Sequence, residues 1–279
     1  MNIQVKASFR KEFLAFFRTG KYIIAGGAII GLAILSPLMI TGLGSLMDSM
    51  SDIYNDMGMD VSVMTGMLGN SSSLGVASSV SDITGVGLMI LLLLINSAAG
   101  GELKRRAVII PRSAGLRSFG YIFPKFIVYP LCAFVFAIVG MIASWAVSLL
   151  VYEVNDVSFV NVMLAGVIAG VCMMLYVCFH ITIGTATGKA GMSAAICIVS
   201  SFLLSNMFAL FSIDYMFNPF ALSVLAGTFI NDSAITGTQL ADVVYTILFT
   251  LALMVFAYFI ALFAQNAKKV DNTGDDIAL

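Results

Sequence analysis

Residues 126–151 read FIVYPLCAFVFAIVGMIASWAVSLLV, a run of 26 residues without a charged side chain. A helix needs about 20 apolar residues to cross the hydrocarbon core of a bilayer. The run is continuously apolar and does not alternate, which favours a spanning helix over a strand of a membrane barrel. This stretch therefore predicts a helix that crosses a membrane.

Similar runs recur along the whole chain, in which 60% of the residues are hydrophobic and only 10% are charged. The mean hydropathy is +1.01, whereas about a quarter of the residues in a soluble domain are charged. We expect one all-α, polytopic membrane domain over residues 1–279. Its six predicted spans lie near residues 22–43, 84–101, 126–151, 159–184, 190–212 and 243–265. Glycine pairs at helical spacing, Gly27 with Gly31 and Gly166 with Gly170, favour close helix packing.

All fourteen lysines and arginines fall on one side of these six spans. They occur before the first span, in the second and fourth gaps, and after the last span. Short loops rich in lysine and arginine mark the cytoplasmic side of a membrane. Both termini are therefore expected in the cytoplasm, and we expect the membrane to be the plasma membrane. Because the basic residues are sorted by side and not massed into a patch, they do not indicate a nucleic-acid partner.

Residues 1–21 predict an amphipathic helix that lies in the membrane interface before the first span. Phe9, Phe13 and Phe17 recur at helical spacing, Arg10 occupies another face, and the chain is expected to turn at Thr19-Gly20. A basic helix with an aromatic stripe lies along a membrane surface. Such a helix could orient the first span, and it could also offer a docking face to a cytoplasmic partner.

The segment 102–125, ELKRRAVIIPRSAGLRSFGYIFPK, is the longest predicted cytoplasmic connection. It mixes charge with an apolar patch, which a short helix would present to a groove on a partner protein. An interfacial loop held by lipid headgroups is the alternative. The candidate docking residues here are Glu102, Ile109, Ile110, Arg112, Leu116 and Arg117.

Two long outer gaps are expected, at 44–83 and 213–242. The first carries aspartates four residues apart, and then a loop from Gly69 to Ser73. These acids predict a surface helix, whose acidic face is either simply solvated or attracts cationic molecules. The second gap has an apolar stretch that ends at Ile230 and is too short to cross, which predicts a re-entrant or interfacial pair of short helices. The aspartates are Asp48, Asp52, Asp56 and Asp60.

The sequence lacks the residues of several kinds of catalytic site. It has no GxxxxGK[ST] loop, so ATP would have to be hydrolysed by another polypeptide, and we expect neither an enzyme nor a metal or cofactor site in this chain. Asp82 and Asp242 are expected at the outer ends of spans, which argues against an ion-coupled carrier. Three polar residues inside spans, His180, Tyr176 and Asn206, could join helices through hydrogen bonds or line a substrate path.

Three stretches together resemble the type-two permeases of ATP-binding-cassette (ABC) transporters, which are largely exporters. FRKEFLAFFRTGKYII (9–24) resembles the elbow helix of that family, the segment 102–125 its coupling segment, and FNPFALSVLAGTF (217–229) its outer re-entrant segment. Glu102, the stretch 115–118 and Lys125 match the outline of the coupling segment. Arg106-Ala107 stand where the family usually has Gly-Thr, and Gly115 replaces the usual proline.

This resemblance covers nearly the whole chain, and the order of the stretches is more specific than any one of them. It implies a permease subunit that forms a substrate path with a second copy or a paralogue. Two separate ATPase subunits, which bind the ATP and magnesium, would dock on the elbow and the coupling segment. Two other functions stay open: a non-transporting membrane partner, such as an immunity or assembly protein, and an ion-coupled secondary carrier.

Overall fold

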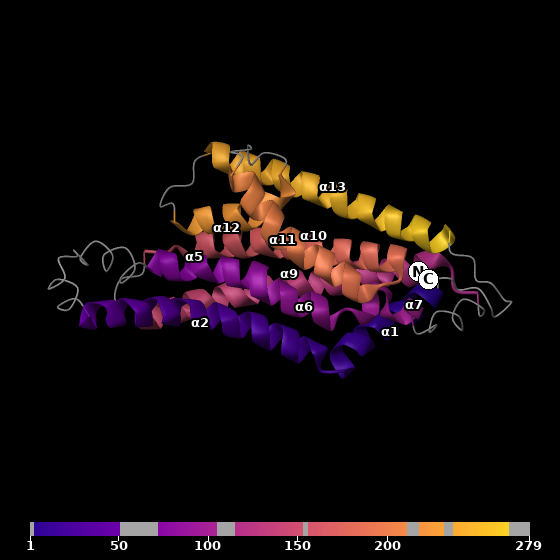
Figure 1. Cartoon of the computed structure of the whole chain (residues 1–279), viewed down its shortest axis with the longest axis horizontal. Helices are drawn as coiled ribbons and strands as arrows, with labels where there is room; N and C mark the ends of the chain where they lie inside the picture. Colours follow the sequence, from indigo (N-terminus) through magenta and orange to yellow (C-terminus); the bar gives the residue numbers. More distant parts are fainter. Residues whose placement is uncertain are drawn as a thin grey trace.

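The computed structural model describes residues 3–50, 72–104, 115–152, 156–210, 218–231 and 237–267, and within these ranges all regular structure is helical. Figure 1 shows most of the long helices lying along one long axis of the molecule. In chain order they are α1 (Ile3–Arg18), α2 (Lys21–Ser49), α5 (Ser72–Asp82), the π-helix η1 (Ile83–Gly87), α6 (Leu88–Leu94), the π-helix η2 (Ser97–Gly101), α7 (Glu102–Lys104), α9 (Ser118–Val151), α10 (Phe159–Thr187), α11 (Ala190–Leu210), the 3₁₀ turn η3 (Pro219–Ala221), α12 (Leu222–Asn231) and α13 (Gly237–Ala267).

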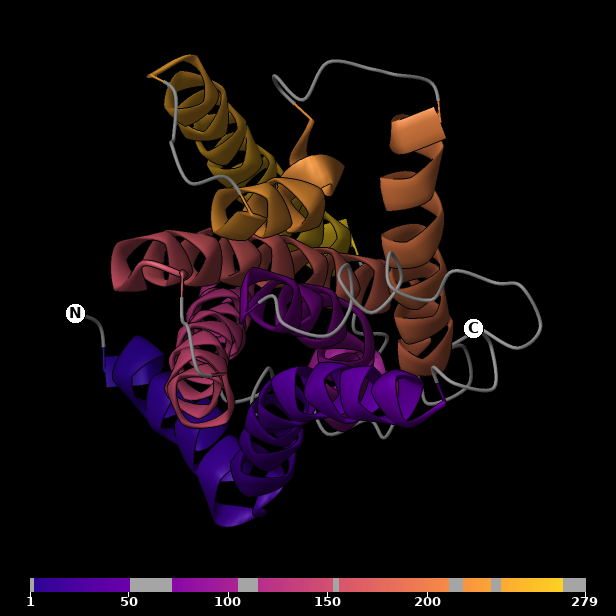
Figure 2. The ribbon, with the colours of Figure 1, turned by 90° about the vertical axis from the view of Figure 1, so that its left-hand side faces the viewer.

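Five stretches of the described chain are helical, long and apolar enough to cross a membrane. They are Lys21–Met47, Ser72–Leu94, Ser118–Val151, Phe159–Thr187 and Leu240–Ala267. The expected span at 190–212 coincides with α11, but its described apolar part, Ala190–Leu204, is shorter than the other five. In Figures 1 and 2, α11 also runs obliquely across the bundle. A sixth crossing therefore stays a prediction.

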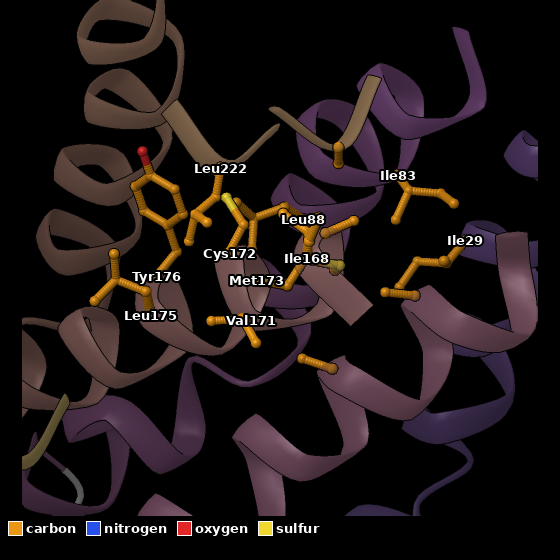
Figure 3. Packing of buried hydrophobic residues seen from close by; sticks show 14 of the residues in the cluster. Ile29, Ile83, Leu88, Ile168, Val171, Cys172, Met173, Leu175, Tyr176 and Leu222 are labelled. Carbon is orange, nitrogen blue, oxygen red and sulfur yellow. The ribbon is translucent and has the colours of Figure 1, made fainter. Parts of the chain in front are cut away.

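Helix α10 lies at the centre of the hydrophobic core, packed against α9, α11, α12 and α13. Figure 3 shows side chains of α10, such as Cys172 and Met173, among residues of neighbouring helices. The absence of a side chain at Gly170 lets α10 lie close to α9. A Cβ built on Gly170 would lie only 2.6 Å from Cδ2 of Phe134. The small-residue packing expected at Gly166 and Gly170 is thus confirmed. Gly27 and Gly31 make no such contact with the described part of the chain.

The second span begins at Ser72, twelve residues before the expected position. The predicted outer gap of 44–83 extends too far at its C-terminal end, because α5 has already begun at Ser72. At its N-terminal end α2 continues to Ser49. Serines and glycine lower the hydropathy of α5, but Gly75 and Ser79 are buried. Small side chains there let α5 lie against α2 and α9. Residues 51–71, with most of the acidic stretch and the start of the Gly69–Ser73 loop, lie outside the described residues.

A proline in α2 explains part of this packing. Pro37 has no N–H, so the carbonyl of Ala33 loses the donor it would have within the helix. The hydroxyl of Ser79 donates to that carbonyl over 3.1 Å and lies 2.7 Å from the hydroxyl of Ser144 on α9. The hydroxyl of Tyr152 donates to the carbonyl of Pro37 over 3.2 Å. These bonds join α2, α5 and α9.

Asp82 lies inside the second span and not at its outer end, so that expectation was wrong. Its Oδ2 accepts a hydrogen bond from the hydroxyl of Ser36 on α2 over 2.5 Å. The side chain is half-buried. Asp242, by contrast, lies within the first residues of the apolar stretch that begins at Leu240, as expected.

A short helical segment precedes the last span. The turn η3 runs directly into α12, and α12 packs against α10 and α5. The side chain of Asn218 accepts from the backbone N–H of Phe220 over 3.1 Å and so caps the turn. The expected pair of short helices is therefore one turn continued by one helix, while residues 211–217 and 232–236 lie outside the described part. That η3 and α12 form a re-entrant or interfacial segment of a membrane stays a prediction.

Candidate functional site

Four charged side chains meet at the end of the bundle where α1, α7 and the start of α9 come together (Figure 1). Lys125 Nζ lies 2.7 Å from Glu102 Oε2 and 3.5 Å from Glu12 Oε1. Lys11 Nζ lies 2.6 Å from Glu102 Oε1 and 3.6 Å from Glu12 Oε1. We call these four residues the charged network. Its two positive and two negative charges balance, which is the condition for burying ions in a protein.

Hydrogen bonds complete the charged network. The hydroxyl of Tyr121 donates to Glu102 Oε2 and that of Tyr129 donates to Glu12 Oε2, each over 2.9 Å. Lys125 also donates to the carbonyl of Ala98 over 3.2 Å and lies 4.5 Å from the ring centroid of Tyr121. Both carboxylates and the buried ammonium are therefore well supplied with partners, which an ion pair needs to repay its desolvation.

Helical spacing places three of these groups together on α9. Tyr121, Lys125 and Tyr129 are four residues apart, so they share one face. That face lies against α1, where Phe16 packs edge-to-face on Tyr129 with ring centroids 5.6 Å apart. Phe9 packs in the same way on Phe123, at 5.9 Å. Helix α1 is thus held to α9 by rings on either side of Glu12.

A close backbone contact positions Glu102. Gly100 has φ of 120°, and a Cβ there would overlap the carbonyl of Gly184 on α10. Only glycine allows the chain to bend so tightly against α10. The bend lies within the π-helix η2, directly before α7, and the Glu102 carboxylate that follows it lies 2.7 Å from Lys125 Nζ.

Glu102 is ionised at neutral pH. Burial alone would raise the pKa of its carboxyl, but the charge of Lys125, together with the bonds from Lys11 and Lys125, outweighs burial and lowers the pKa to about 2. Its side chain is 19% exposed, whereas those of Glu12 and Lys125 are 4% and 0% exposed. Three of the four side chains of the charged network are therefore largely shielded from solvent, whereas that of Lys11 is 47% exposed.

Of the predicted docking residues of α1, two are exposed and two are half-buried. Arg10 is exposed, and Phe13 is 52% exposed and stacks on Phe17 at 4.2 Å between ring centroids. Phe9 and Phe17 are half-buried, and Phe17 packs on the hydrophobic core. Arg10 and Phe13 are therefore the members of this set that a partner could reach most easily.

The coupling segment is described only at its ends. Arg117 is exposed just before α9, and Leu116 is half-buried against a small cluster that includes Ile122 and Ala261. Glu102 is not a surface residue but a member of the charged network. Ile109, Ile110 and Arg112 lie outside the described residues.

The polar residues proposed for a substrate path lie apart from the charged network. His180 is buried on α10, and the hydroxyl of Ser193 on α11 lies 2.7 Å from its Nδ1 and donates to its carbonyl over 2.6 Å. This contact is a helix-to-helix bond, one of the two interpretations open for His180. Tyr176 is buried and lines a cavity between helices. The side chain of Asn206 lies outside the described residues.

Sequence analysis missed Lys11 and Glu12 of the charged network, and also Tyr121 and Tyr129, which donate hydrogen bonds to its carboxylates. One signal for Glu12 was available, because it is the only acid among the six charges of residues 1–21. Lys125 was recognised only as a match to the family outline, although it interrupts an apolar run between two tyrosines. Neither signal names a partner, because the two residues are more than a hundred positions apart in the chain.

Comparison of the chain with protein-family models, with curated proteins and with solved structures gives no match. The fold itself defines the class of protein: an all-helical chain, over its described residues, with five helices able to cross a membrane.

Proposed function

We propose that this chain is the membrane subunit of an ATP-driven exporter of the ABC class. It crosses the plasma membrane six times with both termini in the cytoplasm, and a second copy or a paralogue completes the substrate path. Helix α1 is the interfacial elbow, and α12 is the outer re-entrant segment. Two separate ATPase subunits bind ATP and magnesium and dock on α1 and on the coupling segment.

The charged network is the observation that supports this proposal most strongly. An exporter subunit without its own ATPase needs a stiff connection between the docking surface and the spans. Glu12 on α1 and Glu102 on α7 share one ammonium on α9, at distances of 3.5 and 2.7 Å. Displacing α1 or α7 without α9 would separate a carboxylate from the buried ammonium, and breaking a buried ion pair costs several kcal/mol. A push on α1 or α7 is therefore passed to the third span.

Exposed groups next to the charged network supply a docking surface. Arg10 and Phe13 on α1 and Arg117 before α9 are all exposed. An aromatic ring with neighbouring arginines is typical of the central residues of protein interfaces. The ATPase would bind these groups, while the buried ion pairs beneath them transmit the movement.

The experiment is purification of the tagged chain from its own host. We expect a P-loop ATPase to co-purify, with ATPase activity that depends on this chain. The double change Arg112→Glu and Arg117→Glu should abolish this recovery and stop transport while the spans stay folded. Lys189→Glu is the matched control, since Lys189 is an exposed basic residue outside α1 and the coupling segment. Normal recovery and transport in the double variant would remove the docking assignment. An ATPase that binds but drives no transport would identify a non-transporting partner.

An ion-coupled carrier is the second candidate, and Asp82 is the observation that favours it. An ionisable residue within a span is a default candidate for ion coupling, and Asp82 lies in the stretch Ser72–Leu94. Vesicles that contain only the purified chain separate the two functions. Uphill transport driven by a proton gradient, and lost in Asp82→Asn, would establish the carrier and overturn the exporter.

A further inference from the structure

A cavity of about 290 Å³ lies among η1, α10, α11 and α12, near the end of α5. Its volume is at the lower end of the range of small-molecule pockets. Its described lining contains hydroxyls, one thiol and apolar groups but no charged side chain. The lining residues are Ser81, Thr84, Gly85, Cys172, Tyr176, Ser201, Phe202, Ser223 and Val224.

The cavity has a buried floor and an exposed rim. Thr84, Cys172 and Tyr176 are buried, whereas Phe202 and Val224 are exposed. Figure 3 shows Tyr176 and Cys172 close together on α10, next to Leu222 of α12. The hydroxyl of Tyr176 is buried and has no hydrogen-bond partner among the described residues. Such a group is costly to leave unpaired, and a ligand that gives it a partner recovers that cost.

The floor presents both kinds of hydrogen-bonding group. The hydroxyl of Thr84 donates to the carbonyl of Val80 over 2.7 Å, so its oxygen can only accept further bonds. The hydroxyl of Tyr176 can donate. A ligand that matches both must donate one bond and accept another, as an alcohol does.

The backbone at this wall is unusual. Thr84 and Gly85 belong to the π-helix η1, and short π-helices are frequent at functional sites. A Cβ built on Gly85 would meet the ring of Phe202 at 3.8 Å. That is an ordinary contact, so a longer side chain at this position would extend into the cavity and fill it.

We propose that this cavity binds an uncharged amphiphile, with a hydroxyl group at the floor and a short hydrocarbon chain along Phe202 and Val224. An ion is excluded because nothing in the described lining would compensate its desolvation. The hydroxyl could belong to a lipid, such as a glyceride, or to a soluble alcohol. The site lies within one copy of the chain, so it does not depend on the exporter proposal.

The test uses the full chain in phosphatidylcholine nanodiscs and an octanol that carries a diazirine. After irradiation, peptide mass spectrometry should find the label on the cavity lining, and excess 1-octanol should compete for it while n-octane does not. Gly85→Leu should abolish the competable labelling. Gly27→Leu is the matched control, because a Cβ on Gly27 meets nothing within 4 Å. Labelling that survives Gly85→Leu, or equal competition by octane, would overturn the proposal.

Tyr176→Phe provides an independent arm if Gly85→Leu does not fold. Loss of one hydrogen bond should weaken the competition by 1-octanol about 2- to 10-fold. An unchanged competition curve would contradict the role of the hydroxyl and so the proposed ligand class. Adding a monoacylglycerol to the nanodiscs then identifies the source, because lower labelling indicates a lipid ligand and unchanged labelling indicates a soluble alcohol.

Discussion

The ammonium group of Lys125 donates to the carboxylate of Glu102 over 2.7 Å at a position where the lysine side chain is 0% exposed. A lysine is almost never fully buried unless it is paired. Here the pairing is shared with Glu12, and the three groups come from three separate helices. The contact between α1, α7 and α9 therefore depends on all three charges at once.

Replacing Lys125 by methionine should be strongly destabilising. Methionine fills a similar volume, but Glu12 and Glu102 lose the buried ammonium and keep only the exposed one of Lys11, and breaking a buried pair in this way costs about 3–5 kcal/mol. Thermal unfolding of the purified chain in detergent measures the effect. Lys189→Met is the control and should change stability by less than about 0.5 kcal/mol, because Lys189 is exposed. Equal effects of the two changes would show that the charged network does not hold these helices together.

The pH dependence of stability should be small near neutrality and large in acid. Because the pKa of Glu102 is lowered to about 2 from 4.5, its ion pairs stabilise the fold fully above pH 4.5 and are lost as the pH falls toward 2. The lowered pKa corresponds to about 3 kcal/mol. Unfolding of the native chain and of Glu102→Gln, measured from pH 7 to pH 3, should give curves that converge below pH 4.5. A constant difference over this range would contradict the assignment.

Most of the helices could be predicted from hydropathy because their residues are apolar on every face. Helix α10 begins at Phe159, as expected, and α13 includes the whole predicted stretch 243–265. The start of the second span could not be predicted in this way, because Gly75 and Ser79 reduce its hydropathy. These two residues are nevertheless buried, since their small size lets α5 pack closely on its neighbours. The charged network could not be predicted either, since Glu12 and Lys125 come together only through the packing of α1 on α9.

Ser79→Ala should cost about 1–3 kcal/mol, because it leaves the carbonyl of Ala33 without a donor in a buried place. Ser78→Ala on the same helix is the control, since the hydroxyl of Ser78 bonds only within its own helix, to the carbonyl of Gly75. Adding Pro37→Ala to Ser79→Ala should recover part of the loss by restoring an N–H for Ala33. Calorimetry of the four proteins checks this, and no recovery would indicate that the proline is not the cause.

The two glycine pairs should respond differently to alanine. A Cβ on Gly170 meets the ring of Phe134 at 2.6 Å and its Cα at 3.3 Å, so Gly170→Ala should push α9 away from α10 and cost about 1–3 kcal/mol. Gly27→Ala places its methyl in open space, and the better helix propensity of alanine should leave stability unchanged or about 1 kcal/mol higher. Thermal unfolding compares them. A loss at Gly27 as large as that at Gly170 would reveal a partner on that face of α2.

The crossing of α11 can be settled by cysteine labelling in a chain whose four native cysteines are replaced. Ser158→Cys, Lys189→Cys and Ala241→Cys each place a thiol at an exposed position near a helix end. Six crossings put Ser158 and Ala241 outside and Lys189 inside, since basic loops stay in the cytoplasm. An impermeant maleimide should therefore label the first and third variants in intact cells, and the second only after permeabilisation. If Ala241→Cys behaved like Lys189→Cys, α11 would not cross, and the chain would have five spans with its ends on opposite sides of the membrane.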